Sequence, residues 1–451
     1  MTEVLLLSRT LPRSPPKTCK GAALLVMLFL ILAVFSTMIV SELSKANLEA
    51  QKQKKTQEAL AQAKEALIAF AASVKLNPGR PGDLPCPDKH PPGDPQEGSP
   101  STPCNNTNAS LGRLPWKTLG LPDLRDGSGE RLWYAVSVNF KNSSRSACTS
   151  PQQIGCLNSD TPGTITVRDS VGNIINNGTD STGAIAVIIA PGDSLIRQDG
   201  ISQSRTVANA NDAKNFLDVG DGEDNATFAD GDTNGFINGV VHDADTNVLV
   251  NDHVLAITAN NLMPVLEQRV AGEVLKCLAA YAEKLQNHGR YPWPVVLSPG
   301  VAPDFTNDTS GVRFGRIADT FSATRTDSGN SMDDSWSGDC DINATSGWWP
   351  NWKEHVFYAV ADAYKPGISQ PSCGGTGTCL SVNPPSVATD KQIAVFVAGR
   401  RLLSIPGAQP RSSADKGTIG NYLEDEDATP LDDIFSKKTS SATFNDHVLF
   451  K

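Results

Sequence analysis

An acidic, glycine-rich stretch of the chain carries the first residues that could bind a ligand. Asp230, Asp232 and Asn234 alternate along the chain, and Gly235 follows them. This spacing matches the opening of an EF-hand loop, in which oxygen ligands alternate about a sharp glycine turn. The twelfth position of such a loop would be Val241 and not Glu, so the motif is incomplete. Calcium binding is one interpretation, and a solvated acidic turn, which the incomplete motif favours, is the other.

The six histidines form no motif that would predict zinc binding or catalysis. None has zinc-site spacing or lies in an H-E-x-x-H pattern. The sequence also lacks a G-x-S-x-G elbow, a Walker loop and a G-x-G-x-x-G loop. His253 and His447 stand at the same place in a repeated N-D-H-V-L block. The repeat predicts a shared structural role, with a catalytic pair as the alternative, and the protein is predicted not to be an enzyme.

Four tryptophans cluster in a stretch rich in Gly, Asp and Ser: Trp336, Trp348, Trp349 and Trp352. Exposed aromatic residues on loops often mark binding sites. Exposure would therefore make this stretch a contact for a ligand or a surface. Packing in a core is the other interpretation, and we favour it.

The length and the charge of the chain exclude some classes of protein. The chain has 451 residues, which is long for a single compact domain, and 39% of them are hydrophobic. Its formal net charge is −10. A protein that tracks nucleic-acid phosphates usually presents a basic surface, so no nucleic-acid partner is expected.

A single uncharged apolar run, Ala22–Val40, lies near the N-terminus. Nineteen helical residues span about 28 Å, close to the hydrocarbon thickness of a bilayer, so the run predicts one transmembrane helix. Arg9, Arg13, Lys17 and Lys20 precede it. This basic flank predicts that the N-terminus stays in the cytoplasm and that the rest of the chain is exported.

The cysteines agree with export. Cys19 precedes the apolar run, and an even number of cysteines follows it, as expected for disulfides on the oxidising side. These are Cys86, Cys104, Cys148, Cys156, Cys277, Cys340, Cys373 and Cys379. Eight cysteines allow about 105 pairings. Closeness along the chain favours disulfides between Cys86 and Cys104, between Cys148 and Cys156, and between Cys373 and Cys379. Cys277 and Cys340 are then left as the fourth pair.

The helical pattern continues beyond the apolar run. Residues 42–76 contain no Gly and no Pro and are dominated by strong helix formers. An apolar stripe with three- and four-residue steps runs along them, formed by Leu60, Ala63, Leu67, Phe70 and Val74. We expect one helix of about 50 residues whose second part packs on a globular head. An anchor followed by an unrelated helix is the alternative.

The exported part contains an internal repeat. Asn251–Leu255 recurs as Asn445–Leu449, and other blocks recur in the same order. These blocks are 63–72 with 271–280, 79–80 with 289–290, 132–136 with 356–360, 185–187 with 393–395, and 216–217 with 422–423. A period near 200 residues indicates a duplicated domain, because solenoid units are much shorter.

Each half is predicted to contain a helix, a long loop and three strands. The strands are expected over 132–138, 184–190 and 253–258, and again over 356–361, 392–398 and 447–450. The second helix is expected over 264–287, with a buried stripe of Leu266, Val270, Val274, Cys277, Tyr281 and Leu285. One helix on a small antiparallel sheet is an α+β head.

A short basic leader ends in Lys20-Gly21 directly before Ala22 and the apolar run. This junction resembles a type IV prepilin leader, and the resemblance implies cleavage after Gly21 by the prepilin peptidase, with Ala22 first in the mature chain. The family usually has Glu at the fifth mature position, where Val26 stands here. In the family, the charge of this Glu sets the register between neighbouring subunits. A chain that lacks it resembles the minor and tip subunits. The sequence motif at residues 84–88, followed by the motif at residues 112–116, resembles large prepilin-like proteins of Gram-negative bacteria.

The resemblance implies an α+β fold in which a single N-terminal transmembrane helix continues into a pilin-like helix-plus-antiparallel-sheet head, followed by a second similar head. The expected domains are a cytoplasmic leader (1–21), the N-terminal transmembrane and amphipathic helix (22–76), the first head (77–260) and the second head (261–451).

The implied function is that of a minor tip or initiating subunit of a type IV pilus or a type II secretion pseudopilus. Its expected partners are the prepilin peptidase, other pilin or pseudopilin subunits and the inner-membrane assembly platform. The expected location is the inner membrane with periplasmic heads, and later the filament or cell surface. The alternatives are a membrane-anchored periplasmic hydrolase, since carboxylates are plentiful, and a pilus-tip adhesin that uses the tryptophans.

Overall fold

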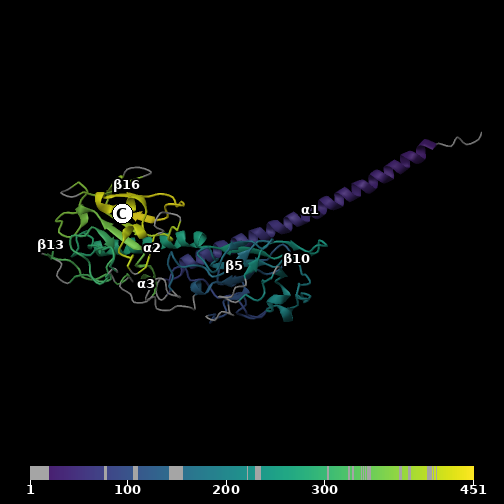
Figure 1. Cartoon of the computed structure of the whole chain (residues 1–451), viewed down its shortest axis with the longest axis horizontal. Coiled ribbons are helices and arrows are strands. Elements are labelled where there is room, and N and C mark those ends of the chain that lie inside the picture. The colour runs from purple at the N-terminus through teal and green to yellow at the C-terminus, as the bar shows by residue number, and fades with distance from the viewer. Residues whose placement is uncertain are drawn as a thin grey trace, which may run out of the picture. The chain divides into compact units, whose positions relative to one another are not determined.

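The fold is taken from a computed structural model of the whole chain (Figure 1). It describes the chain from Lys20 to Lys451 except for residues 76–78, 105–109, 142–155, 221, 229–234, 302–303, 323–325, 328–329, 337, 339, 341, 343–346, 375–377, 384–387, 404–408, 410 and 413. The chain divides into two compact units, Met1–Lys55 and Thr56–Lys451. The second unit holds all the sheets.

Helix α1 runs without interruption from Lys20 to Ser73. The predicted fold class included an N-terminal transmembrane helix, and this is corrected: no helix in the described part of the chain is long and apolar enough to span a bilayer. Within Ala22–Val40, only Met27 and Leu28 have described side chains. From residue 42 onward α1 carries nine charged residues, too many for an apolar span.

The end of α1 packs in the core of the second unit. Ala63, Leu67 and Ala71 are completely buried, as expected for one face of a helix with apolar residues at three- and four-residue steps. The helix ends three residues earlier than predicted, so Val74 lies beyond it and is only half-buried.

The first half is built on a four-stranded antiparallel sheet in the order β1-β2-β5-β11. Its strands are β1 (Leu111–Arg113), β2 (Trp133–Val136), β5 (Ala186–Ala190) and β11 (His253–Ile257). The second half has the equivalent sheet in the order β12-β15-β18-β20. Its strands are β12 (Phe314–Arg316), β15 (Val356–Val360), β18 (Ile393–Val397) and β20 (His447–Phe450). Three strands of each sheet were predicted; β1 and β12 were not.

Each half also carries a small mixed sheet with one parallel pair. In the first half β3 (Val167–Arg168) lies between β4 (Ile174–Asn176) and the parallel strand β8 (Phe236–Ile237). In the second half β16 (Leu380–Asn383) lies between β17 (Ala388–Lys391) and the parallel strand β19 (Ile434–Ser436). The two halves therefore share their topology beyond the main sheet. The domain boundary at residue 260 itself stays a prediction.

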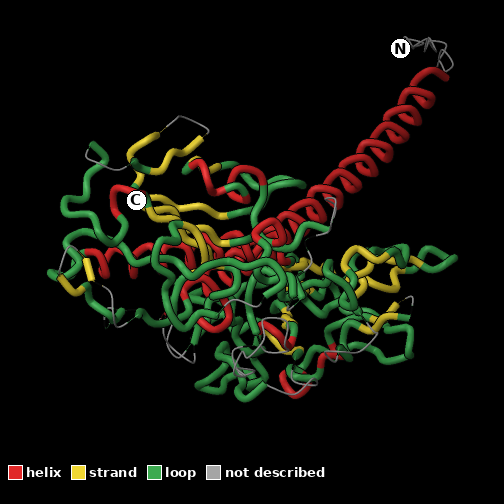
Figure 2. The backbone as a smooth tube through the Cα atoms, turned by 60° about the vertical axis from the view of Figure 1, so that its left-hand side comes forward, coloured by secondary structure: helices red, strands yellow, loops and turns green. Residues whose placement is uncertain are grey.

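The remaining elements are short, and loops make up much of the second unit (Figure 2). The hairpins are β6 (Val219–Gly220) with β7 (Glu223–Asp224), β9 (Val241–His242) with β10 (Val248–Val250), and β13 (Thr326–Asp327) with β14 (Asn330–Ser331). The short helices are η2 (Val138–Phe140), η3 (Val207–Asn209), η4 (Ala213–Asn215), α3 (Trp349–Trp352), η6 (Asp362–Tyr364), η7 (Ile419–Asn421), η8 (Asp425–Ala428) and η9 (Pro430–Asp432).

Helix α2 (Ala259–Ala282) begins and ends five residues before the predicted bounds. Thr258 and Asn261 form a capping box that fixes its start, which places Pro264 inside the helix. Five residues of the predicted stripe are buried, but Leu285 lies in the turn after the helix and is 90% exposed. The turn continues into His288 and Gly289, both with positive φ.

A continuous core joins the two halves. It contains residues from the end of α1, from α2, from both main sheets and from the tryptophan-bearing segment. Alternate residues of the central strands face opposite sides, as the pleat of a strand requires. In β18, for example, Val395 belongs to this joint core and Phe396 to a second core on the other face. In β5 of the first sheet, Ile188 likewise belongs to the joint core and Ile189 to a separate one, so both main sheets are covered on both faces.

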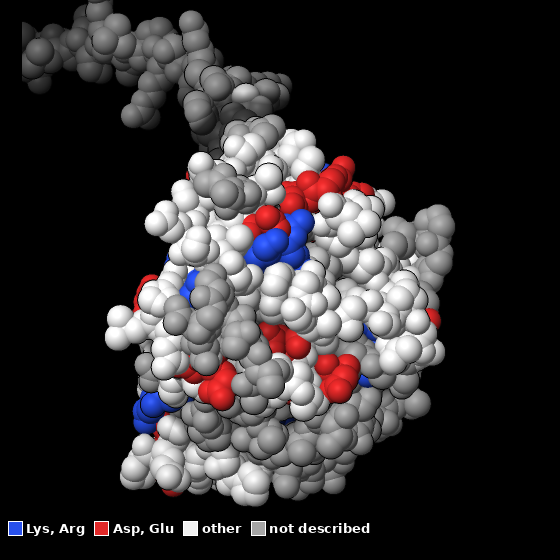
Figure 3. Space-filling view, turned by 90° about the vertical axis from the view of Figure 1, so that its left-hand side faces the viewer, with Lys and Arg blue, Asp and Glu red and all other residues white. Residues whose placement is uncertain are grey.

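Figure 3, viewed from the end where β13 lies, shows a group of basic side chains beside acidic ones and, elsewhere on this face, small separate groups of acidic side chains. In the second half, ion pairs join neighbouring side chains of opposite charge. They include Lys284 with Asp333 at 3.1 Å, Lys353 with Asp319 at 2.9 Å and Lys416 with Glu354 at 2.7 Å.

The outer edge of each main sheet is covered by a single residue. Asp88 and Arg113 exchange two backbone hydrogen bonds, both at 2.8 Å. Val295 and Arg316 do the same in the second half, at 2.8 and 3.1 Å. This contact hides the unpaired amides that an edge strand otherwise exposes.

Candidate functional site

A buried acidic cluster lies where the acidic loop of the first half meets β11. Gln203 Nε2 donates to Asp218 Oδ1 at 2.8 Å, and the backbone N–H of Asn251 donates to Asp218 Oδ2 at 2.7 Å. The backbone N–H of Asp218 and the Nδ2 of Asn225 both donate to Asp252 Oδ2 at 2.8 Å. The Asp252 side chain thus ties the acidic loop to the start of β11.

The second half repeats this arrangement. Gln409 Nε2 donates to Glu424 Oε1 at 2.6 Å, and the backbone N–H of Asn445 donates to Glu424 Oε2 at 3.0 Å. The backbone N–H of Glu424 donates to Asp446 Oδ2 at 2.8 Å. The repeated Asn-Asp pair of the N-D-H-V-L block therefore contacts the acidic residue of the loop in the same way in both halves.

One position differs between the two clusters. Asn225 Oδ1 accepts from the backbone N–H of Ile237 at 2.9 Å. The equivalent contact of the second half is the carboxylate Asp427 Oδ1, which accepts from the backbone N–H of Ser436 at 2.7 Å. The second cluster therefore carries three acidic side chains where the first carries two.

Burial shifts the proton affinity of these carboxyl groups. It raises the pKa of Asp218 to about 6, and burial together with the Asp218 charge raises the pKa of Asp252 well above its usual range. Burial also raises the pKa of Glu424 and Asp446, and that of Asp427 to about 8. Two carboxylates in one desolvated site cannot both ionise cheaply, so burial favours the protonated form of these groups.

The chemistry that these clusters support is the tethering of a loop to a strand by hydrogen bonds that buried carboxyl oxygens accept. In the part of the chain that the structure describes, no group of three or more His, Cys, Asp or Glu side chains is arranged to hold a metal ion. Asp252 Oδ1 and Asp446 Oδ1 are buried and have no hydrogen-bond partner among the described atoms.

A buried ion pair joins the two halves. Asp160 of the first half receives both a 2.9 Å contact from Arg411 Nη1 and a 3.0 Å hydrogen bond from the backbone N–H of Arg401. His355 Nε2 lies 3.3 Å from the same carboxylate. The Arg411 charge and the His355 contact outweigh the burial of Asp160 and lower its pKa. Asp160 therefore stays ionised and clamps the second half to the first.

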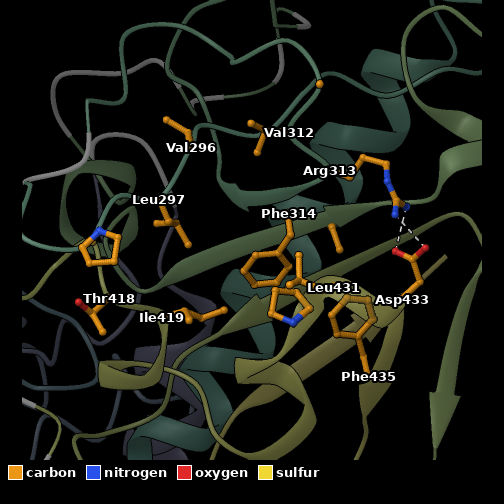
Figure 4. A pocket seen from close by; sticks show the side chains of 15 residues that line it. Val296, Leu297, Val312, Arg313, Phe314, Thr418, Ile419, Leu431, Asp433 and Phe435 are labelled. Carbon is orange, nitrogen blue, oxygen red and sulfur yellow. Dashed lines mark hydrogen bonds and ion pairs between the residues drawn. The ribbon is translucent and has the colours of Figure 1, made fainter.

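A pocket of about 460 Å³ opens beside β12 in the second half (Figure 4). Its lining is mostly apolar and includes Val296, Leu297, Phe314, Ile419, Leu431 and Phe435. At one end, Arg313 donates from Nη1 and Nη2 to the two carboxylate oxygens of Asp433, at 2.8 and 2.9 Å. Leu297, Thr418 and Ile419 lie at the other end (Figure 4). Asp433 has a positive φ of 60°.

The first half has a pocket of about 420 Å³ beside β1, at the equivalent place. Both pockets lie between the first strand of the main sheet and the short helix η4 or η7. The lining of the first pocket is charged, however, and includes Asp88, Lys89, Arg113, Asp212 and Lys214. The duplication kept the pocket and changed its chemistry.

The structure buries all four tryptophans, with exposed fractions of 7% or less. They belong to the joint core, as in the packing interpretation, and do not form an exposed binding surface. Trp349 Nε1 donates to Asp319 Oδ1 at 2.6 Å, and Trp336 Nε1 donates to the carbonyl oxygen of Ala318 at 3.1 Å.

Disulfides join Cys86 to Cys104, Cys277 to Cys340 and Cys373 to Cys379. These are pairs that closeness along the chain and elimination favoured. Cys148 lies outside the described residues.

The other predicted site residues either lie on different elements of the structure or fall outside the described residues. Asp230, Asp232 and Asn234 are not described, so calcium binding there stays a prediction. Gly21 and Ala22 lie in the first turn of α1, without described side chains. His253 begins β11 and His447 begins β20, where His447 Nδ1 lies 3.4 Å from Glu267 Oε2.

The glutamine and arginine residues around the acidic clusters were not predicted from the sequence, although a repeated sequence pattern marks them. Gln203-Ser204-Arg205 recurs as Gln409-Pro410-Arg411. Each glutamine binds the acidic side chain, and each arginine donates to the carbonyl oxygen of a glycine, Arg205 to Gly192 at 2.6 Å and Arg411 to Gly399 at 3.1 Å. The Q-x-R pattern is a further block of the repeat.

Comparison with known proteins yields no relative: no protein-family model, no curated protein and no solved structure matches this chain.

Proposed function

We propose that the chain is a structural subunit of a type IV pilus or of a type II secretion pseudopilus, present in few copies at the tip or at initiation. One observation carries the proposal. A single uninterrupted helix begins at Lys20, next to the expected cleavage point, and its last part packs with two copies of a four-stranded antiparallel head. A filament subunit needs such a helix to associate with those of sister subunits.

The N-terminal end of α1 supports a minor position in the filament. Its first turn contains no acidic residue, and Val26 stands at the fifth position of the proposed mature chain. The subunit thus has no carboxylate there to pair with a neighbouring N-terminal amine. It would act with the prepilin peptidase, with sister subunits and with the assembly platform, and without catalysis of its own.

The two heads support a low copy number. The unit Thr56–Lys451 contains two main sheets with their flanking sheets and a joint core, and among the described residues α1 is the one N-terminal helix that enters this core. A filament of many such subunits would have to accommodate two heads per helix. The disulfides among the described residues agree with assembly in an oxidising compartment.

N-terminal sequencing of the mature protein tests the proposal directly. In cells with the prepilin peptidase the chain is expected to begin at Ala22, and in cells without it at Met1. A Gly21→Val variant should also begin at Met1, whereas Gly420→Val, at an exposed position with no atom within 4 Å of a new Cβ, should be processed normally. A chain that begins at Met1 in every strain, or that is cut C-terminal to Val40, would refute the proposal.

Abundance tests the position in the filament. Quantitative mass spectrometry of sheared filaments should find the chain at a few copies per filament. An abundance equal to that of the main subunit would contradict a tip or initiating role.

A further inference from the structure

The pocket beside β12 has the size and lining of a small-molecule site. Its volume of about 460 Å³ falls within the range of about 300–1,000 Å³ typical of ligand pockets. Such pockets are mostly apolar with a few polar groups that orient the ligand. Here the apolar wall includes the partly buried ring of Phe314, which lies 6.1 Å from the completely buried ring of Phe435 and nearly parallel to it.

The charged groups of the pocket neutralise each other. Arg313 and Asp433 form two parallel hydrogen bonds at one end of the pocket, and their side chains are only 28% and 20% exposed. A charged ligand would have to compete with this bidentate pair. The pocket therefore favours an uncharged ligand, with the Arg313–Asp433 pair offering polar atoms at one end.

The first half provides an internal comparison. Lys89 and Val296 both directly follow the residue that covers the sheet edge, and both line their pockets. Asp212 and Thr418 both directly precede the short helix across the pocket. At these two positions a charged residue of the first pocket thus has an uncharged equivalent in the second.

The mouth of the pocket exposes apolar side chains to water. Leu431 is 96% exposed and Val296 is 45% exposed, although both line the pocket. Water contact with these groups is unfavourable, and an apolar ligand in the pocket would cover part of them.

From these observations we infer that the pocket beside β12 binds a small, uncharged molecule with an aromatic or fused-ring body. The body packs against Phe314, Ile419 and Leu431, and a hydrogen-bonding group of the ligand faces the Arg313–Asp433 pair. The polar pocket of the first half does not bind this class. The inference concerns a site that the proposed role in a filament does not use, so either can hold without the other.

The neutral fluorescent probe N-phenyl-1-naphthylamine tests the inference on the full chain. Its fluorescence rises when it enters an apolar site, so a titration should show a saturable component. Val296→Trp fills the mouth of the pocket and should weaken that component at least tenfold. Lys89→Trp makes the same change at the equivalent exposed position of the first half, and its affinity should stay within twofold of that of the unaltered protein.

A second variant, Leu431→Glu, tests the same pocket in case Val296→Trp weakens probe binding only by disturbing the fold. Leu431→Glu changes a side chain that is almost completely exposed, so the fold should survive, and the new charge at the mouth should weaken the probe at least fivefold. Equal affinities in Val296→Trp, Leu431→Glu and Lys89→Trp would place the probe elsewhere and overturn the inference. The absence of any saturable component in the unaltered protein would overturn it as well.

Discussion

Asp252 and Asp446 hold the same position in the two halves: each accepts a 2.8 Å hydrogen bond at Oδ2 from the backbone N–H of an acidic residue in the preceding loop, Asp218 in one case and Glu424 in the other. Each follows an asparagine and precedes the last strand of its main sheet. The most specific motif of the repeat is therefore a tether between loop and strand, formed by two carboxyl groups whose pKa burial raises.

The tether makes stability depend on pH. Burial raises the folded-state pKa of Asp218 to about 6 and that of Asp427 to about 8, above the value of about 3.9 expected in the unfolded chain. The folded state thus binds these protons more tightly, and their contribution is complete below about pH 4. We expect the free energy of unfolding, measured with denaturant, to fall as pH rises from 5 to 8.

Asp252→Asn should reduce this pH dependence. Its amide oxygen can keep the hydrogen bonds from Asp218 and Asn225, while the second buried negative charge is removed. We expect the variant to be more stable than the unaltered protein at pH 8 by about 1 kcal/mol, the order of a tenfold change in proton affinity. Asp245→Asn, at an exposed position, is the control and should keep the full slope. An unchanged slope in Asp252→Asn would contradict the tether.

The clamp between the halves predicts the opposite pH dependence. Asp160→Asn leaves Arg411 buried without its carboxylate, and we expect a loss of roughly 2–3 kcal/mol at pH 7. Because the folded-state pKa of Asp160 is lowered, its contribution is present above about pH 4 and is lost as pH falls further. The difference between variant and unaltered protein should therefore be smaller at pH 3 than at pH 7.

Denaturant unfolding at both pH values measures this difference. Asp334→Asn, an exposed residue of the second half, is the matched control and should change stability by less than about 0.5 kcal/mol. A loss that is equally large at pH 3 would mean that the Asp160 charge does not hold the clamp.

The central strands could be predicted because they are buried on both faces. Ile185 to Ala190 and Ile393 to Ala398 read as short apolar runs between turn residues, and the structure forms β5 and β18 there. The edge strands β1 and β12 are only three residues long, which is too short for a periodicity. The recurring Gly-Arg of 112–113 and 315–316 was the available signal.

The candidate site was harder to predict than the sheets. Four tryptophans close together in the sequence are compatible with an exposed binding surface and with a buried core. Only the packing in the structure distinguishes these two interpretations, and it leaves Trp352 completely buried. The pocket beside β12 involves Val296, Phe314, Ile419 and Leu431, which lie far apart in the sequence and include no reactive side chain. A site made by apolar residues from four segments leaves no motif.

The disulfides predict unequal losses of stability. Replacing Cys277 and Cys340 by Ser opens a loop with a sequence separation of 63, whereas replacing Cys373 and Cys379 opens one with a separation of 6. Loop-closure entropy then gives losses of about 4 and about 2 kcal/mol, respectively. Denaturant unfolding of the two double variants measures both values. The Cys277–Cys340 pair also joins α2 to the tryptophan segment, so an equal or reversed order would contradict its role in the core.

The close approach at the sheet edge predicts a strong effect at Gly315. A Cβ atom there would lie 1.9 Å from the carbonyl oxygen of Val295, which accepts the edge hydrogen bond from Arg316. The backbone can yield only by weakening that bond, so Gly315→Ala should cost about 2 kcal/mol in denaturant unfolding. At Gly112 the nearest atom is 2.8 Å away, and Gly112→Ala should cost about 1 kcal/mol. Gly420→Ala, where no atom lies within 4 Å, should be neutral within about 0.5 kcal/mol, and equal losses in all three variants would contradict the edge contact.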